Sequence, residues 1–428
     1  MKKLLVVSCA ALGAAEALKA GLNRFGQLLE VEPVFPALTI PAQAALLTGE
    51  PPAQTGAVGN GFYHRELRRV YFWEQSAELV SGERPWERFE RESGCAAGSA
   101  LLFFQNSIGV NADVVITPAP VHAPDGRLIP ACYTRPAMLA GHLEAKLGPF
   151  PLHHYWGPLA GLPASQWIAA ATELVIRGDA PDLIYAYLPH LDYDLQRFGP
   201  DSLPATKALQ ELSGLLEQLA ESAGGVGYEV VILGDYAIEP ATSVAFPNRE
   251  LREAKLLAVR RVGPFELPDF GASLAFAVAD HQVAHVYCQN GLDPQVVVEG
   301  FEGVPGVGRI LDRKAQAELG LDHPRSGDVV LEAAPGAWFA YDWWTDEADA
   351  PPYARTVDIH NKPGYDPLEL FFAPDKRGTA RDAGLVKGTH GRAGGRPAAL
   401  VLPEGAAASS ERIKATEVAG LLAALAGE

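Results

Sequence analysis

The amino-acid sequence predicts an α/β fold built around a mostly parallel sheet, and two kinds of segment lead to this prediction. Short, continuous apolar runs, such as residues 183–188 and 228–233, are typical of strands buried on both faces, as strands are in parallel sheets. Longer segments with apolar residues at helical spacing, such as residues 165–177 and 203–222, separate these runs. Strands that alternate with helices along the chain are characteristic of α/β proteins.

The other elements follow from local patterns taken in chain order. Residues 4–7 are expected to form the first buried strand and residues 14–29 a helix. The apolar run before Cys9 is shorter than the roughly 7–15 residues of a signal-peptide core, so we expect a cytoplasmic protein rather than an exported one. No run is long and apolar enough to span a bilayer. Further elements are expected at residues 38–47 (helix), 276–287 (strands), 326–340 (hairpin) and 408–427 (helix).

Composition divides the chain into three segments. Residues 1–61 hold the first part of a core domain. Residues 62–163 are irregular and rich in aromatic residues, proline and glycine, and we expect them to form an insertion or cap, because recognition surfaces concentrate in loop-built segments. Residues 164–428 return to alternating strands and helices and complete the core.

The overall charge limits the classes of partner. The chain of 428 residues carries a net charge of −17, which argues against a nucleic-acid backbone or an anionic membrane surface as partner. A small phosphorylated substrate remains compatible with this charge, because a helix terminus or a metal ion can override the global field locally. The four cysteines include no C-x-x-C pair, so neither a zinc knuckle nor a disulfide framework is expected.

The stretch of residues 34–63 contains the first candidate for chemistry. Thr39 precedes Pro41 and a run of helix-forming residues that Gly49 ends, so Thr39 is predicted at the N-cap of a helix. Unpaired N–H groups in the first turn of a helix attract anions. They can also stabilise an alkoxide, which a nucleophilic hydroxyl requires. The alternative, that Thr39 only caps its helix, stays open.

The same stretch resembles the nucleophile segment of the alkaline phosphatase superfamily, in its type I phosphodiesterase/nucleotide pyrophosphatase branch. In that branch a strand, a threonine, a helix ending in Thr-Gly and a P-P-x-x-x-G-x-V-G-N turn follow one another. The matching residues here are Thr48, Gly49, Pro51, Pro52, Gly56, Val58, Gly59 and Asn60. The resemblance implies an alkaline-phosphatase-like fold of three α/β/α layers with an inserted cap, and it assigns the nucleophile to Thr39.

The resemblance also implies two divalent metal ions, usually zinc, on either side of the phosphate. In the family one ion is held by an aspartate and two histidines, and the other by two aspartates, a histidine and the threonine. Carried onto this sequence, the pattern assigns metal ligands to Asp192, Asp235 and His390. Such ions would activate the attacking oxygen and stabilise the leaving oxygen.

Several positions depart from that pattern. Gln196 and Tyr236 stand where the family has ligand histidines, Ala10 stands where it has the aspartate of the first strand, and Ala42 replaces an asparagine after the nucleophile. Because glutamine and tyrosine are poor zinc ligands, we expect fewer than two ions, with Mg²⁺ or Mn²⁺ as alternatives to zinc. Candidates for replacement or outer ligands are Gln196, Tyr236, His190, Asp194, Asp280, His281, Asp358 and His360.

One of these candidates depends on backbone geometry, because Asp192 and Asp194 share a face only if the strand tip that holds them is extended. For each additional histidine, a purely structural role remains the alternative.

Three hypotheses about function follow from the resemblance. The first is a metal-dependent hydrolase of phosphodiester or phosphate-anhydride bonds, in which Thr39 attacks the phosphorus of a small substrate. The second is a relative that binds a phosphorylated or anionic small molecule without hydrolysing it, which the altered ligand positions favour. The third keeps catalysis but at a different bond, as in the mutases and sulfatases of the superfamily.

Overall fold

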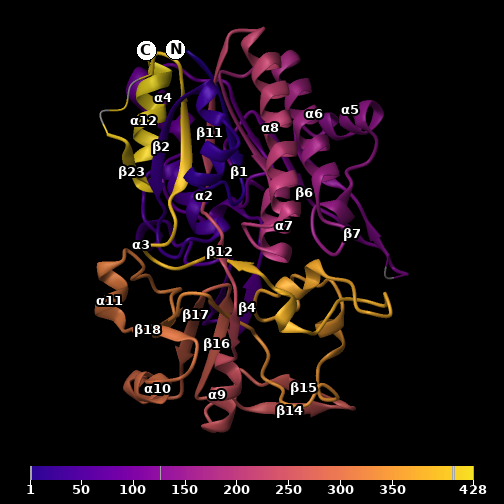
Figure 1. Ribbon diagram of the computed structural model, residues 1–428, viewed down its shortest axis with the longest axis vertical. Helices are drawn as coiled ribbons and strands as arrows, with labels where there is room; N and C mark the ends of the chain where they lie inside the picture. Colours follow the sequence, from indigo (N-terminus) through magenta and orange to yellow (C-terminus); the bar gives the residue numbers. More distant parts are fainter. Residues whose placement is uncertain (1, 126, 407, 409, 428) are drawn as a thin grey trace.

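A nine-stranded sheet forms the centre of the larger of two lobes in the computed structural model, which describes residues 2–125, 127–406, 408 and 410–427 (Figure 1). Five adjacent strands of this sheet run parallel, and β22 and β9 are antiparallel to their neighbours. In spatial order the strands are β23 (Arg412–Lys414), β2 (Gly26–Glu32), β22 (Ala398–Pro403), β11 (Tyr228–Gly234), β1 (Lys3–Cys9), β10 (Leu183–Leu188), β5 (Ser99–Leu102), β6 (Val114–Pro118) and β9 (Cys132–Arg135).

Helices cover both faces of this sheet, which gives the lobe three layers (Figure 1). The buried side chains of the strands and of both helix layers form one continuous apolar core, as the continuous apolar runs predict. One layer contains α6 (Leu162–Arg177), α7 (His190–Phe198) and α8 (Leu203–Gly224), and the other contains α2 (Thr39–Thr48), α4 (Pro85–Ser93) and α12 (Ala415–Gly427). No helix among the described residues has the length and apolar character needed to cross a bilayer.

The second lobe is built between two short strands that pair with each other, β12 (Glu239–Pro240) and β21 (Gly388–Thr389). It has its own apolar core around an antiparallel sheet. In spatial order this sheet contains β16 (Ala275–Asp280), β17 (Val283–Cys288), β19 (Val329–Ala333) and β18 (Val307–Leu311). Helices α9 (Pro247–Glu253), α10 (Pro294–Phe301) and α11 (Arg313–Glu318) and the hairpin of β14 (Val259–Val262) and β15 (Phe265–Pro268) complete the lobe.

The arrangement of the lobes differs from the division expected from composition. Strands β5, β6 and β9 lie within residues 62–163, yet they extend the central sheet instead of forming a separate cap. The unit inserted into the core is the second lobe, which lies within residues 164–428. The hairpin of β3 (Gly61–His64) and β4 (Arg69–Phe72) joins this lobe through Tyr63, whose ring lies 4.7 Å from that of Phe276.

Residues 14–29 do not form the single helix that their spacing predicts. Helix α1 (Ala14–Lys19) ends early, a 3-10 turn follows, and β2 begins at Gly26. Gly21 and Gly26 have φ angles of 66° and 143°, which interrupt a right-handed helix and are readily adopted only by glycine. At the other end of the chain, α12 begins at Ala415 after strand β23, and part of the expected helix over residues 408–427 lies outside the described residues.

Candidate active site

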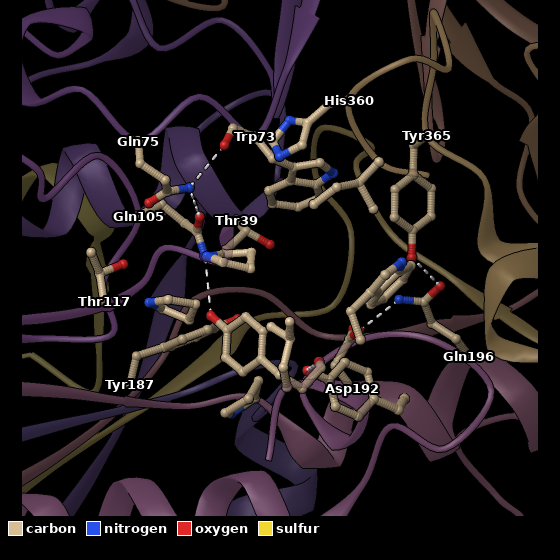
Figure 2. Close-up of a pocket in the computed structure, with 18 of the residues that line it drawn as sticks. Thr39, Trp73, Gln75, Gln105, Thr117, Tyr187, Asp192, Gln196, His360 and Tyr365 are labelled. Atoms are coloured by element: carbon tan, nitrogen blue, oxygen red, sulfur yellow. Dashed lines mark hydrogen bonds between the residues drawn. The ribbon is translucent and has the colours of Figure 1, made fainter. Parts of the chain in front are cut away.

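A cavity of about 180 Å³ lies at the carboxyl ends of the parallel strands, where α/β sheets place their ligands (Figure 2). Tyrosine and tryptophan side chains are the largest group in its wall, and no lysine or arginine belongs to the described residues that line it. The lining consists of Thr39, Trp73, Gln75, Gln105, Thr117, Pro118, Pro120, Leu152, Tyr155, Trp156, Tyr187, Pro189, Asp192, Tyr193, Gln196, Tyr236, His281, Ile359, His360 and Tyr365.

Thr39 is the first residue of α2, and Leu38 occupies the N-cap position. The Thr39 side chain does not cap the helix. Its Oγ1 lies 3.4 Å from the hydroxyl oxygen of Tyr236, and both residues line the cavity. The helix start offers fewer donors to an anion than the sequence suggests. The Leu38 N–H donates to the Pro36 carbonyl oxygen, and the Ile40 N–H donates to Asn60 Oδ1. Pro41 has no N–H, so the Thr39 N–H is the one donor of this turn that these bonds do not use.

Asp192 is carried by helix α7, which begins directly after β10. The extended tip on which a shared face of Asp192 and Asp194 depends is therefore absent here. Residues 192 and 196 lie one helical turn apart instead, and Gln196 Nε2 donates to Asp192 Oδ2 at 2.6 Å. The second oxygen, Asp192 Oδ1, accepts from the Tyr236 hydroxyl at 3.2 Å. Asp194 points elsewhere and pairs with Arg197 at 3.1 Å.

Tyr365, from the second lobe, completes the hydrogen bonds around this carboxylate. Its hydroxyl donates to Gln196 Oε1 at 2.8 Å (Figure 2). Its ring stacks on His281 with the centroids 3.6 Å apart. The His281 ring lies 4.0 Å from the ring of His390, which stacks on Tyr236 at 3.6 Å. Side chains from both lobes thus form one wall of the cavity.

Both histidines of this stack are fixed through their Nδ1 atoms. His390 Nδ1 donates to the carbonyl oxygen of Ala37 at 2.7 Å, and His281 Nδ1 lies 2.7 Å from Asp280 Oδ1. Asp280 is held in turn by the Asn60 backbone N–H and side-chain amide, at 2.8 and 3.2 Å. The Nε2 atoms of both histidines are buried and have no hydrogen-bond partner among the described residues.

Burial shifts the protonation of these groups. It raises the pKa of Asp192 to about 7, although the hydrogen bonds from Gln196 and Tyr236 act in the opposite direction. Burial also raises the pKa of Tyr236 well above its usual range, so its hydroxyl stays protonated. Burial lowers the pKa of both His281 and His390 well below the usual value, so the two rings are neutral.

Asp235 lies behind Tyr236 and outside the described set of cavity-lining residues. Its Oδ1 accepts from the backbone N–H groups of Ala11 and Tyr236, both at 2.9 Å, while Oδ2 is buried without a partner among the described residues. Burial raises the pKa of Asp235 well above its usual range. These contacts fix the end of β11 beside the loop that follows β1.

The sequence between residues 18 and 366 matches one protein family, described as type I phosphodiesterase / nucleotide pyrophosphatase. The chain belongs to this family. It is therefore a member of the alkaline phosphatase superfamily, as the stretch around Thr39 suggests. A comparison with curated protein sequences finds no match.

Solved structures of other members show the same fold. Phosphonoacetate hydrolase from Sinorhizobium meliloti 1021, in complex with phosphonoformate, has a TM-score of 0.65 at 16% identity, over 100% of this chain and 96% of the other. Murine ectonucleotide pyrophosphatase/phosphodiesterase 5, as an inactive threonine-to-alanine variant in complex with AMP, has a TM-score of 0.60 at 14% identity, over 100% and 95% of the two chains. The expected alkaline-phosphatase-like α/β/α fold is confirmed.

Members of this family are metallohydrolases, but the donor set here does not fit their metal ions. Among the described residues, no group of three histidine, cysteine, aspartate or glutamate side chains is placed to hold a metal. The expected ligands Asp192, Asp235 and His390 all contact Tyr236, but they are not arranged around a common ion. Asp192 holds a donor on each oxygen, Asp235 bonds to backbone N–H groups, and His390 packs against Tyr236. The Gln196 amide and the Tyr236 phenol hold the positions that the family resemblance assigns to two ligand histidines.

The remaining candidate ligands have separate surroundings. His360 lines the cavity, with its Nδ1 3.0 Å from the carbonyl oxygen of Phe72. His190 is buried under α8 with its Nε2 3.3 Å from the Ala208 carbonyl oxygen. Asp358 accepts hydrogen bonds from Asn361 at an exposed turn.

Tyr365 and Trp156 also line the cavity, and neither matches a position of the family pattern. Tyr365 lies in the polar, glycine-containing segment DIHNKPGYDP. The only sign in the sequence that it could line a pocket is that it is a single large aromatic residue in a polar segment. Trp156 belongs to the aromatic segment expected to shape a pocket, and its Nε1 donates to Glu369 at 2.5 Å.

Proposed function

We propose that this protein hydrolyses a phosphodiester or phosphate-anhydride bond of a small phosphorylated molecule, with Thr39 as the nucleophile. One observation carries the proposal: the Thr39 hydroxyl faces the cavity and hydrogen-bonds Tyr236 instead of capping its own helix. Phosphonate and AMP complexes of the structural neighbours support a phosphorylated ligand. The inactive threonine-to-alanine variant of the murine protein supports a threonine with a central role.

The hydrogen bonds set a direction for the proton. The Tyr236 hydroxyl donates to Asp192, so its oxygen accepts from the Thr39 hydroxyl and leaves the Thr39 oxygen lone pairs free. In the proposed reaction Thr39 Oγ1 bonds to phosphorus as the bond between phosphorus and the leaving oxygen breaks, and the leaving oxygen takes any proton it needs from solvent water. The proton of Thr39 moves towards Tyr236 and Asp192. Water then cleaves the Thr39–phosphorus bond and restores the hydroxyl.

No step of this reaction is assigned to a metal ion, because both Asp192 oxygens hold hydrogen-bond donors. The Thr39 N–H at the start of α2 lies beside the attacking oxygen and would stabilise negative charge on the transferred group. The amides of Gln75 and Gln105 and the Thr117 hydroxyl supply uncharged polar contacts elsewhere in the cavity (Figure 2).

A second candidate function is binding of a small phosphorylated molecule without cleavage. A specific observation favours it: the described residues that line the cavity include no lysine or arginine to offset the charge that develops in phosphoryl transfer. In this case the aromatic wall and Thr39 would hold the ligand, and the altered family positions would have removed catalysis.

Turnover of bis-p-nitrophenyl phosphate by wild-type protein and by Thr39→Ala, Thr39→Ser and Thr172→Ala variants tests the proposal. Thr172 is a matched control, since it is buried and its hydroxyl bonds its own helix at Ile168. Loss of turnover in Thr39→Ala, with activity in the control and partial activity in Thr39→Ser, is expected for a nucleophile. A phosphorylated Thr39 peptide in quenched reactions would identify the intermediate. If the protein binds the ligand but shows no turnover that Thr39→Ala removes, the second function would be established instead.

A further inference from the structure

Both carboxylate oxygens of Asp192 hold a donor, and each donor comes from a position where the family resemblance places a metal-binding histidine. Tyr236 donates to Oδ1 at 3.2 Å, and Gln196 donates to Oδ2 at 2.6 Å. Each carboxylate oxygen has two lone pairs, one of which its donor occupies, so a divalent cation would have to share both oxygens with these donors. The two donors therefore compete with a cation for Asp192 directly.

The same donors belong to a closed ring of side chains. Starting from Asp192, hydrogen bonds lead through Gln196 to the hydroxyl of Tyr365. Ring contacts lead from Tyr365 through His281 and His390 to Tyr236, whose hydroxyl returns to Asp192. The two histidine–tyrosine contacts are stacked, and the contact between the histidines is tilted by 43°. The members of this closed ring are Asp192, Gln196, Tyr365, His281, His390 and Tyr236.

Packing explains why the histidines of the closed ring serve as stacking partners. The planes of Tyr236 and His390 differ by 4°, and those of Tyr365 and His281 by 20°, so each histidine lies flat against a tyrosine. The Nδ1 contacts with Ala37 and Asp280 hold the imidazoles in these orientations. Tyr236, His281, His390 and Tyr365 are all buried, so water competes little with their contacts.

We propose that this closed ring replaces the metal centre of the family, so that the site keeps its geometry without a divalent ion. Tyr236 and Gln196 take over the electrostatic task of a cation at Asp192, because each places a partial positive hydrogen on one carboxylate oxygen. Tyr365 keeps the Gln196 amide in the orientation that presents its NH₂ group to Asp192. This inference holds whether Thr39 cleaves a ligand or only binds it.

Metal stoichiometry tests the inference independently of activity. Wild-type protein, purified without a metal column and dialysed first against Zn²⁺ or Mn²⁺ and then against metal-free buffer, is expected to retain well below one ion per chain. Elemental analysis by mass spectrometry gives the ratio. An Asp192→Asn variant should retain the same small amount, because that metal would be bound elsewhere. The Gln196→His/Tyr236→His double variant should gain about one ion per chain, and adding Asp192→Asn should remove it.

Two results would overturn the inference. Wild-type protein that retains an ion which Asp192→Asn removes would show that the site binds metal despite the closed ring. A double variant that is folded by circular dichroism but gains no ion would show that Tyr236 and Gln196 do not cause the exclusion. Thermal unfolding with and without Zn²⁺ provides a second readout, since only a variant with the restored site should be stabilised. Failure of the Thr39 hypothesis would appear in turnover and leave these ratios unchanged.

Discussion

The hydroxyl oxygens of Thr39 and Tyr236 lie 3.4 Å apart, and the Tyr236 hydroxyl donates to Asp192 Oδ1 at 3.2 Å. The two hydroxyls come from α2 and from the loop after β11, which are 197 residues apart in the chain. In the family resemblance, position 236 belongs to a histidine that holds a metal. Here a phenol links the candidate nucleophile to a carboxylate.

Replacing Tyr236 with phenylalanine removes the link but keeps the ring that stacks on His390. If Thr39 is activated through Tyr236, turnover of bis-p-nitrophenyl phosphate should fall on the order of 10²-fold. The free energy of unfolding should fall by about 1–3 kcal/mol, since Asp192 Oδ1 loses its donor. Tyr287→Phe is the control for stability effects, because it removes a buried hydroxyl that donates to the Arg325 carbonyl oxygen and accepts from the Tyr63 N–H. Unchanged turnover in Tyr236→Phe would exclude the proton path.

The charge of the ligand should matter more than its shape. No lysine or arginine belongs to the described cavity-lining residues, so a second negative charge on the ligand would be buried without a countercharge. We expect methyl phenyl phosphate, a monoanion, to bind at least about tenfold more tightly than phenyl phosphate, a dianion at pH 8 with the same ring. Calorimetric titration measures both constants. Equal or tighter binding of the dianion would show that a cationic group serves the site.

Stability should depend on pH through His285, a buried residue of β17. Burial lowers the pKa of His285 from 6.5 to about 4 in the folded protein. The unfolded chain therefore binds a proton below pH 6.5 that the folded protein binds only near pH 4, so stability decreases as the pH falls through this interval. The full loss is about 3 kcal/mol, and about 2 kcal/mol of it is expected between pH 7 and pH 5.

Urea unfolding at pH 7 and pH 5 measures this dependence. The His285 ring accepts from the Gly327 N–H at 3.0 Å, and its Nε2 lies 3.0 Å from the Val58 carbonyl oxygen, so protonation breaks one of two bonds. In His285→Gln, the difference between the free energies of unfolding at pH 7 and at pH 5 should be smaller than in the wild type by about 2 kcal/mol. His142→Gln, at an exposed position, should leave it unchanged. A His285→Gln difference equal to that of the wild type would contradict the assignment.

A buried ion cluster supports the cavity wall from behind. Lys362 Nζ lies 2.9 Å from Asp366 and 2.5 Å from Glu369, and Glu369 also accepts from the Trp156 indole. Lys362→Met would leave the buried Glu369 without a cationic partner and Asp366 with only Arg381, at 3.7 Å. The substitution should destabilise the protein by about 3–5 kcal/mol, measured by urea unfolding. Lys207→Met removes an exposed pair with Glu211 and should cost at most about 1 kcal/mol. Similar effects of the two substitutions would show that the cluster is not effectively buried.

The sequence by itself determined the local elements on which the site is built. The apolar runs that become β10 and β11 are continuous because both faces of these strands are buried, and the polar residues that follow them fall at the sheet edge that binds ligands. Thr39 lies at the start of α2 because Pro41 and the alanine-rich run favour a helix there. Such patterns act over a few residues and can be read without the fold.

Only the tertiary structure decided which side chains meet. Asp192 lies on a helix and not on an extended tip, so Gln196 reaches its carboxylate from one turn away. Tyr365 approaches Gln196 from another lobe, 169 residues later in the chain. Contacts over such separations depend on how the lobes pack and leave no periodic signal in the sequence. The family pattern could therefore place Asp192, Tyr236 and His390 at one site, but it could not show that they bond and stack with each other.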